Sequence, residues 1–94
     1  MSKPRFVATL VERHSPMEAT FRLSVPWETT RFIDQQVVSL DQVTLVCSGP
    51  DPVSDMFSVH VHQFPGEHNY SLASFATGNF QYVLDCMGYE MRLS

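Results

Sequence analysis

Alternating hydrophobic and polar positions dominate the first third of the chain. Residues 5–13 are rich in β-forming residues, and residues 19–25 alternate with the period of a β-strand. The second strand is expected to bury its apolar side chains on one face: Ala19, Phe21, Leu23 and Val25. Pro16 lies between the two segments and cannot donate to a strand ladder. The two strands are therefore predicted to form a hairpin with a loop of about five residues.

The next segment has a less regular pattern. Pro26 is expected to end the second strand. A helix over residues 27–40 would gather apolar residues on one stripe, but the threonines and valines of this segment are poor helix formers. We therefore expect an irregular or briefly helical connection leading into a strand. Residues 42–47 are nearly all apolar, which is typical of a central strand buried on both faces.

The second half of the chain changes its hydrophobic period once. Residues 56–64 alternate again and follow a segment rich in glycine and proline, which predicts a second hairpin with a loop of about eight residues. From Ser71 the period becomes about 3.6, which predicts an amphipathic helix over residues 71–87 that ends at Gly88. Residues 89–93 return to the alternation of a strand.

These elements predict an α+β fold. The expected architecture is an antiparallel sheet of about five strands, two hairpins plus a C-terminal strand, with one amphipathic helix (about 71–87) packed on one face. Residues 1–94 are expected to form a single domain. One helix covers only part of such a sheet. Apolar residues of the other face, such as Val7 and Val11, are then expected to be covered by the segment around Trp27 or by a second copy in a homodimer.

Composition favours a cytoplasmic protein. Hydrophobic residues make up 44% of the chain and charged residues 17%, as in globular proteins. No apolar run reaches the length of about 18 residues that a membrane helix needs, and no apolar signal segment follows the N-terminus. No membrane association is expected. Cys47 and Cys86 lie outside any CxxC spacing and are predicted to be buried, reduced thiols, with a disulfide between them as the alternative.

The charge of the chain is unevenly distributed. Residues 1–31 carry five Lys and Arg against three Glu, a net +2, whereas residues 32–94 carry one Arg against seven acids, a net −6. The acidic part favours a protein partner with a basic surface, for example a nucleic-acid-binding protein, and disfavours direct binding to nucleic acid. Alternatively, the acids are scattered over turns and serve solubility. The candidate partner-binding residues are Asp34, Asp41, Asp51, Asp55 and Glu67.

Two histidines on one strand are the main candidates for chemistry. His60 and His62 point to the same side of an extended strand, about 7 Å apart. With Glu67 they form a run that resembles part of the first metal motif of the cupin family, where two strand histidines and a glutamate hold iron, manganese or a similar ion. The resemblance covers eight residues, and Ser54 and Ser74 replace the flanking glycines of the motif. It implies an alternative function as a small metal-binding protein or enzyme. Otherwise the pair consists of histidines at the rim of a half-exposed strand.

No catalytic residues are assigned from the sequence. It has no nucleophile elbow and no glycine-rich phosphate loop, and no cofactor is expected. This favours a non-enzymatic protein-binding module. By analogy of type, stand-alone acidic proteins of this size are frequent among phage or mobile-element inhibitors of host defence, including anti-CRISPR proteins, and among immunity proteins and antitoxins. An inhibitor or accessory protein that blocks a basic surface of its partner is the leading hypothesis.

Overall fold

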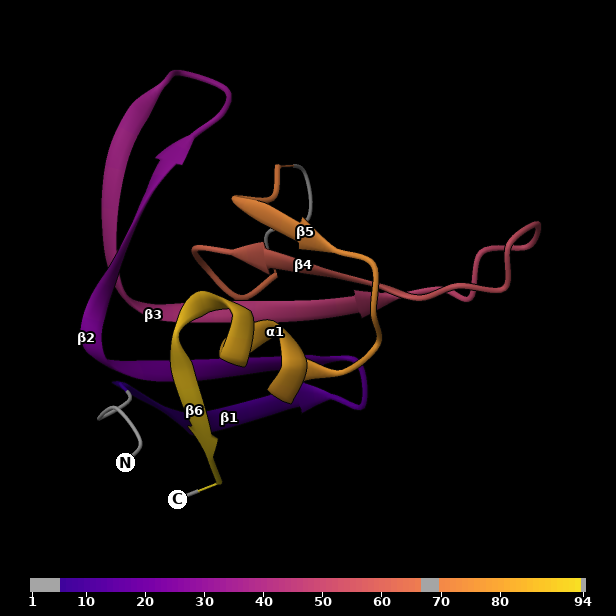
Figure 1. Cartoon of the computed structure of the whole chain (residues 1–94), viewed down its shortest axis with the longest axis horizontal. Coiled ribbons are helices and arrows are strands. Elements are labelled where there is room, and N and C mark those ends of the chain that lie inside the picture. Colours follow the sequence, from indigo (N-terminus) through magenta and orange to yellow (C-terminus); the bar gives the residue numbers. More distant parts are fainter. Residues whose placement is uncertain (1–5, 67–69, 94) are drawn as a thin grey trace.

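The computed structural model describes residues 6–66 and 70–93, which form one sheet with one short helix on its face (Figure 1). The elements are β1 Phe6–Ser15, β2 Glu18–Arg31, β3 Gln36–Ser48, β4 Ser58–His62, β5 Ala73–Phe75, α1 Phe80–Met87 and β6 Tyr89–Arg92. The strand order is β5-β4-β3-β2-β1-β6. A sheet with one helix was correctly predicted. The sheet is not purely antiparallel with about five strands, however, because it has six and β6 runs parallel to β1.

The long strands β2 and β3 correct the prediction for residues 27–40. This segment is neither irregular nor helical: Trp27 to Arg31 of β2 pairs with Gln36 to Leu40 of β3. Pro26 does not end β2, because it lies in a bulge where residues 23–26 oppose only Asp41, and a bulge needs no donor from proline. We call the ribbon formed by residues 27–40 the arm. It bends away from the rest of the sheet beyond this bulge (Figure 1).

The helix is much shorter than predicted. It covers Phe80–Met87, because the side chain of Asn79 accepts hydrogen bonds from the backbone N–H groups of Gln81 and Tyr82 and caps the first turn. Residues 73–75 instead pair with the free edge of β4 as a strand. Gly88 ends the helix in the left-handed conformation, as predicted. Within the described residues, no helix has the length and apolar character needed to cross a membrane.

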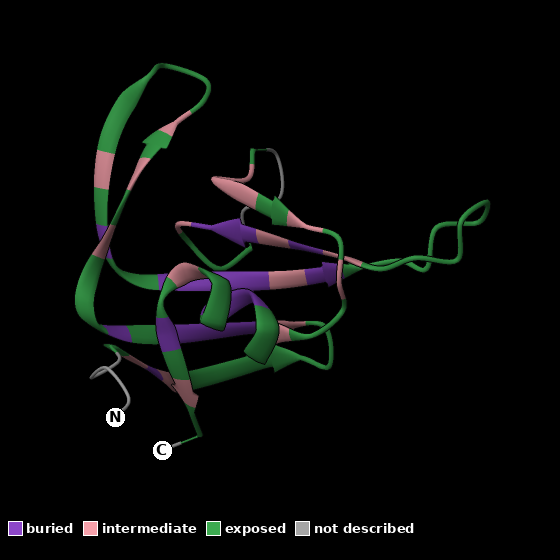
Figure 2. Cartoon of the chain, viewed as in Figure 1, coloured by how far each residue is buried: buried purple, intermediate pink, exposed green. Residues whose placement is uncertain are grey.

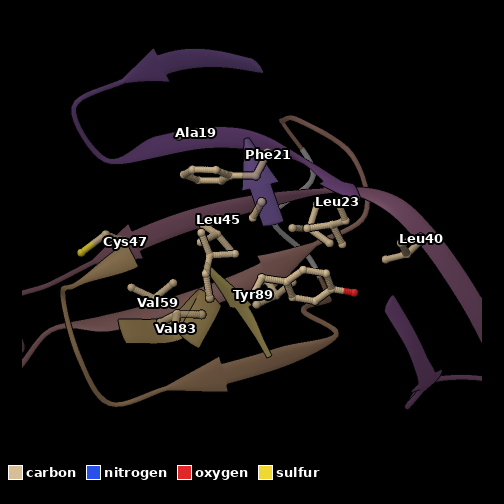
Figure 3. Packing of buried hydrophobic residues seen from close by; sticks show 13 residues of the cluster. Ala19, Phe21, Leu23, Leu40, Leu45, Cys47, Val59, Val83 and Tyr89 are labelled. Carbon is tan, nitrogen blue, oxygen red and sulfur yellow. The ribbon is translucent and has the colours of Figure 1, made fainter. Parts of the chain in front are cut away.

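The core lies between α1 and the sheet (Figures 2 and 3). Strand β3 is a central strand, as predicted, and Val43, Thr44 and Leu45 are fully buried. Phe21 of β2 meets Phe80 of α1 edge-on, with ring centroids 6.3 Å apart. The residues that form the buried cluster are Ala8, Ala19, Phe21, Leu23, Leu40, Val43, Leu45, Cys47, Val59, Val61, Val83, Leu84 and Tyr89.

Among the described residues, no helix or strand covers the sheet face opposite α1, here called the outer face, although the segment after β4 covers the part of it around His62 (Figure 1). The prediction that the segment around Trp27 covers Val7 and Val11 on this face is wrong. Val11 is exposed, and Trp27 packs against the core cluster. Val25, predicted to be buried, is also exposed because it lies in the β2 bulge, where the inward alternation is lost.

The two cysteines are both free thiols but differ in burial. Cys47 is buried in β3, and burial raises the pKa of its thiol. Cys86 lies on the exposed side of α1, so the prediction that it is buried is wrong. The helical stripe that contains Val83 and Leu84 faces the core, and Cys86 lies outside that stripe.

This difference predicts the alkylation behaviour of the native protein. Cys86 should react with iodoacetamide at the rate of an exposed thiol, whereas Cys47 should react at least about a hundredfold more slowly, because its reaction requires a local opening that costs a few kcal/mol. Peptide mass spectrometry after timed quenching measures both rates in one sample. In a Cys86→Ser variant the fast phase should disappear, and equal rates for the two thiols would contradict the burial of Cys47.

Candidate functional site

His60 and His62 both lie on the outer face of β4, as their spacing predicted. Their ring centroids are 6.5 Å apart. His60 Nδ1 is 2.8 Å from the hydroxyl oxygen of Ser74 on β5, and His62 Nδ1 is 3.2 Å from the carbonyl oxygen of Tyr70. His62 is buried, with 3% of its surface exposed, so it is not a rim histidine. The segment after β4 runs back past it, which explains this burial.

The predicted metal ligands are only partly described. Glu67 lies outside the described residues. Among the residues that the structure does describe, no group of three or more His, Cys, Asp or Glu side chains is arranged to hold a metal ion. Each ring has its Nδ1 atom within hydrogen-bond distance of an oxygen atom, an arrangement that metal-ligating histidines share, so these two contacts do not count against a metal. No observation favours the metal-dependent alternative.

A row of hydrogen-bonded side chains crosses the outer face beside His62. Thr44 of β3 is the register partner of both Thr20 on β2 and His62 on β4. The hydroxyl oxygens of Thr20 and Thr44 are 2.8 Å apart, and His14 Nε2 is 2.7 Å from the Thr20 hydroxyl oxygen. Glu12 Oε2 is 3.3 Å from His14 Nδ1. We call Glu12, His14, Thr20 and Thr44 the polar row.

The polar row has the chemical order carboxylate, imidazole, hydroxyl, which is also the order of groups around an activated nucleophile. A nucleophile must reach its substrate, however, and Thr20 is only 5% exposed. The hydrogen bonds of the row provide partners for hydroxyl groups that the sheet buries. We therefore assign the polar row a structural role. No local pattern in the sequence indicates this row, because it depends on the register between strands that are distant in the chain.

The described acidic candidates lie in three different places. Asp34 is in the turn at the tip of the arm, where Arg31 donates hydrogen bonds to both of its carboxylate oxygens and lowers its pKa. Asp41 is exposed at the base of the arm. Asp51 and Asp55 lie together in the long β3–β4 loop at the opposite end of the molecule (Figure 1). Much of the charge of Asp34 is therefore compensated locally, and of the described candidates the structure brings together only Asp51 and Asp55.

The β3–β4 loop, residues 49–57, projects well beyond the sheet (Figure 1), and we call it the projecting loop. The Asp51 carboxylate accepts hydrogen bonds from the backbone N–H groups of Ser54 and Val53, which lower its pKa. Two backbone hydrogen bonds also join Asp51 to Met56 and Asp55. These hydrogen bonds to the ionised Asp51 carboxylate are therefore present at neutral pH and are lost only when the pH falls through this lowered pKa. The loop has a defined internal structure despite its exposure.

The base of the projecting loop is closely packed. Gly49 has a φ of 123°, and a Cβ atom there would lie 2.9 Å from the Met56 carbonyl oxygen, so no side chain fits without a backbone shift. Phe57 lies against both Gly49 and Gly78. Beyond this base, Val53 is 96% exposed and Met56 is also exposed. The loop therefore displays apolar side chains beside two carboxylates.

A cavity of about 350 Å³ lies between the arm and the segment that enters β5. It is lined by Arg31, Phe32, Ile33, Gln63, Tyr70, Ser71 and Leu72. Of the acidic and histidine residues singled out from the sequence, none of those that the structure describes lines it. Its exposed apolar side chains from the arm, Phe32 and Ile33, mark the arm as a second region where apolar surface meets solvent.

Comparisons with known proteins give no functional information. No family model matches the chain, and neither the curated proteins nor the solved structures contain a significant match. Sequence reasoning singled out Asp51 and Asp55 through their charge, but it did not identify Val53 and Met56, because their exposure depends on how far the loop projects.

Proposed function

We propose that this chain is a non-enzymatic protein-binding module that presents the projecting loop to a basic surface of a protein partner. Its mode of action is that of an inhibitor or accessory protein, which occupies its partner's surface and performs no chemistry there. A nucleic-acid-binding protein is one class of partner that offers such a surface. The observation that carries the proposal is the exposure of Val53 beside Asp51 and Asp55 on a loop with its own hydrogen bonds.

Each part of the loop contributes a different property to binding. Exposed apolar side chains next to charges are a feature of interaction sites, because their burial against a partner is favourable. The carboxylates of Asp51 and Asp55 accelerate encounter with a positive surface and determine orientation. The internal hydrogen bonds keep the loop ordered before binding, so less conformational entropy is lost when the complex forms.

Two substitutions in the loop test this proposal without disturbing its internal structure. Asp55 has a φ of 59°, a conformation that asparagine also tolerates, so Asp55→Asn removes the charge and retains the backbone. Val53→Ser removes an apolar side chain that is 96% exposed, with little expected effect on folding. Asp51 is unsuitable because its carboxylate holds the loop together.

The measurement is quantitative affinity capture from cell lysate with the wild-type chain at low and high salt. We expect a basic protein to bind at low salt, to dissociate at high salt, and to be captured about tenfold less by either loop variant. The matched controls Glu90→Gln and Val11→Ser change an exposed acid on β6 and an exposed valine on β1, and should capture as wild type does. Capture of a basic protein in equal amounts by the wild type and by both loop variants would contradict the proposal.

A further inference from the structure

The hydrogen bonds of the projecting loop determine its internal shape but not its direction. Strands β3 and β4 pair as far as Ser48 and Ser58, and the loop lies beyond this last pair. Within the part of the chain that the structure describes, no hydrogen bond or ion pair joins residues 49–57 to a residue outside the loop. The direction of the loop relative to the sheet therefore has to come from side-chain packing at its base.

Phe57, the last residue of the loop, packs against a segment that is distant in the chain. A Cβ atom at Gly78 would lie 3.2 Å from Cβ of Phe57 and 3.3 Å from Cγ. A Cβ atom at Gly49, at the start of the loop, would lie 3.2 Å from Cδ1 of the same ring. These distances are tighter than nine in ten contacts that real Cβ atoms make. The ring therefore occupies space that the two glycines leave open.

This packing lies outside the hydrophobic core. Phe57 is 39% exposed, and among the described residues it belongs neither to the buried cluster nor to the side chains packed against that cluster. Phe21 and Phe80, by contrast, join α1 to the sheet. The contact of Phe57 with Gly78 therefore affects mainly the loop.

The segment that Phe57 contacts is itself held in place. Residues 76–79 connect β5 to α1 and pass beside the base of the loop (Figure 1). The backbone N–H of Thr77 donates a hydrogen bond to the carbonyl oxygen of Phe75, and Asn79 caps the first turn of α1. Because α1 packs on the core, this connection offers a fixed surface to the ring.

We propose that Phe57 is the positioning residue of the projecting loop, because its ring, packed against Gly78, fixes the direction in which the loop leaves the sheet. Without the ring, the loop should keep its internal hydrogen bonds and swing as a unit about the last residue pair of β3 and β4. The consequence for binding rests on the proposed function. A loop held in one direction presents Val53 and Asp55 with less loss of conformational entropy when a complex forms.

NMR of the ¹⁵N-labelled chain tests this role without a partner. Order parameters derived from residual dipolar couplings also sense motions slower than nanoseconds. For the Val53 and Ser54 amides we expect about 0.85 in the wild type and below about 0.6 in Phe57→Ala. Hydrogen exchange of the same two amides should stay as slow as in the wild type, because the Asp51 carboxylate still accepts their hydrogen bonds.

Three further variants separate positioning from a general effect on the fold. Phe57→Tyr keeps the ring and should restore the wild-type order parameters. Phe32→Ala removes a ring that is 83% exposed on the arm and should not change them. Gly78 has no positive φ, so Gly78→Ala is compatible with the backbone, and its added methyl group presses on Phe57. This last variant should change the couplings of the loop and leave those of β3 unchanged.

Two results would overturn the positioning role. One is a wild-type loop whose order parameters lie below about 0.6. The other is a Phe57→Ala loop that is as ordered as the wild type. If Phe57→Ala does not fold, Gly78→Ala decides, and unchanged loop couplings in that variant would overturn the role.

The positioning role and the proposed function fail separately. A disordered wild-type loop would overturn the positioning role even if Asp55→Asn and Val53→Ser reduce capture of a basic protein. Conversely, Phe57→Ala may release the loop in a chain whose Asp55→Asn and Val53→Ser variants capture as the wild type does. That result would support the positioning role of Phe57 and contradict the proposed function.

Discussion

Replacing Phe21 by alanine should lower the free energy of unfolding by about 3–5 kcal/mol. Phe21 is fully buried on β2, and its ring packs edge-on against Phe80, so it joins α1 to the sheet. A truncated side chain would leave a cavity at the centre of a small core, which the surrounding strands cannot close because their backbones are fixed by the ladder. For a domain of this size the loss is a large fraction of the total stability.

Urea denaturation followed by the fluorescence of Trp27 measures this effect. The matched control is Phe32→Ala, which removes the same ring from a position that is 83% exposed and should change stability by about 0.5 kcal/mol or less. Both variants are compared with wild type at one protein concentration, because dimerisation would make stability depend on concentration. Equal losses for the two variants would mean that the sheet and helix do not share the core described above.

The sequence pattern predicts strands well where one face is buried. Ala19, Phe21 and Leu23 alternate in the chain because they alternate between core and solvent in the structure. The same pattern correctly places His60 and His62 on one face of β4. It cannot show that His62 is buried, because the cover comes from the segment that carries Tyr70 after the strand ends.

The arm shows where local rules compete. The β-branched residues around Thr29 and Val37 favour strands, and they are strands in the structure. Proline has no backbone N–H to donate, so Pro26 predicts the end of a strand. The prediction fails because Pro26 lies in a bulge, where the opposite strand needs no hydrogen bond from it. A bulge depends on the opposite strand, so no local pattern in residues 23–26 reveals it.

The helix prediction fails for a related reason. Leu72 and Phe75 fit a helical stripe, but both also pack against the core from an extended segment. The free edge of β4 pairs with residues 73–75, and this pairing makes the segment a strand and not part of the helix. The start of the helix does have a local signal: Asn79 is a strong capping residue placed just before Phe80. The parallel pairing of β6 with β1 has no local signal.

The polar row supplies the second large effect on stability. Thr20→Val should cost about 2–3 kcal/mol, because it removes the hydroxyl that joins His14 to Thr44 and deprives the fully buried Thr44 hydroxyl of this partner. Thr44→Val should cost only about 1 kcal/mol, since Thr20 then still has His14 as a partner. The two substitutions conserve volume, so the difference between them reports hydrogen bonding rather than packing.

The double variant Thr20→Val, Thr44→Val distinguishes this account from simple loss of contacts. It removes the hydroxyl of Thr44 together with its partner, so it should be more stable than Thr20→Val alone by about 1 kcal/mol. Urea denaturation of wild type, both single variants and the double variant gives the coupling energy directly. Additive losses would mean that the Thr44 hydroxyl finds another partner when Thr20 is changed. In that case the stability of the outer face would not depend on the bond between the two threonines.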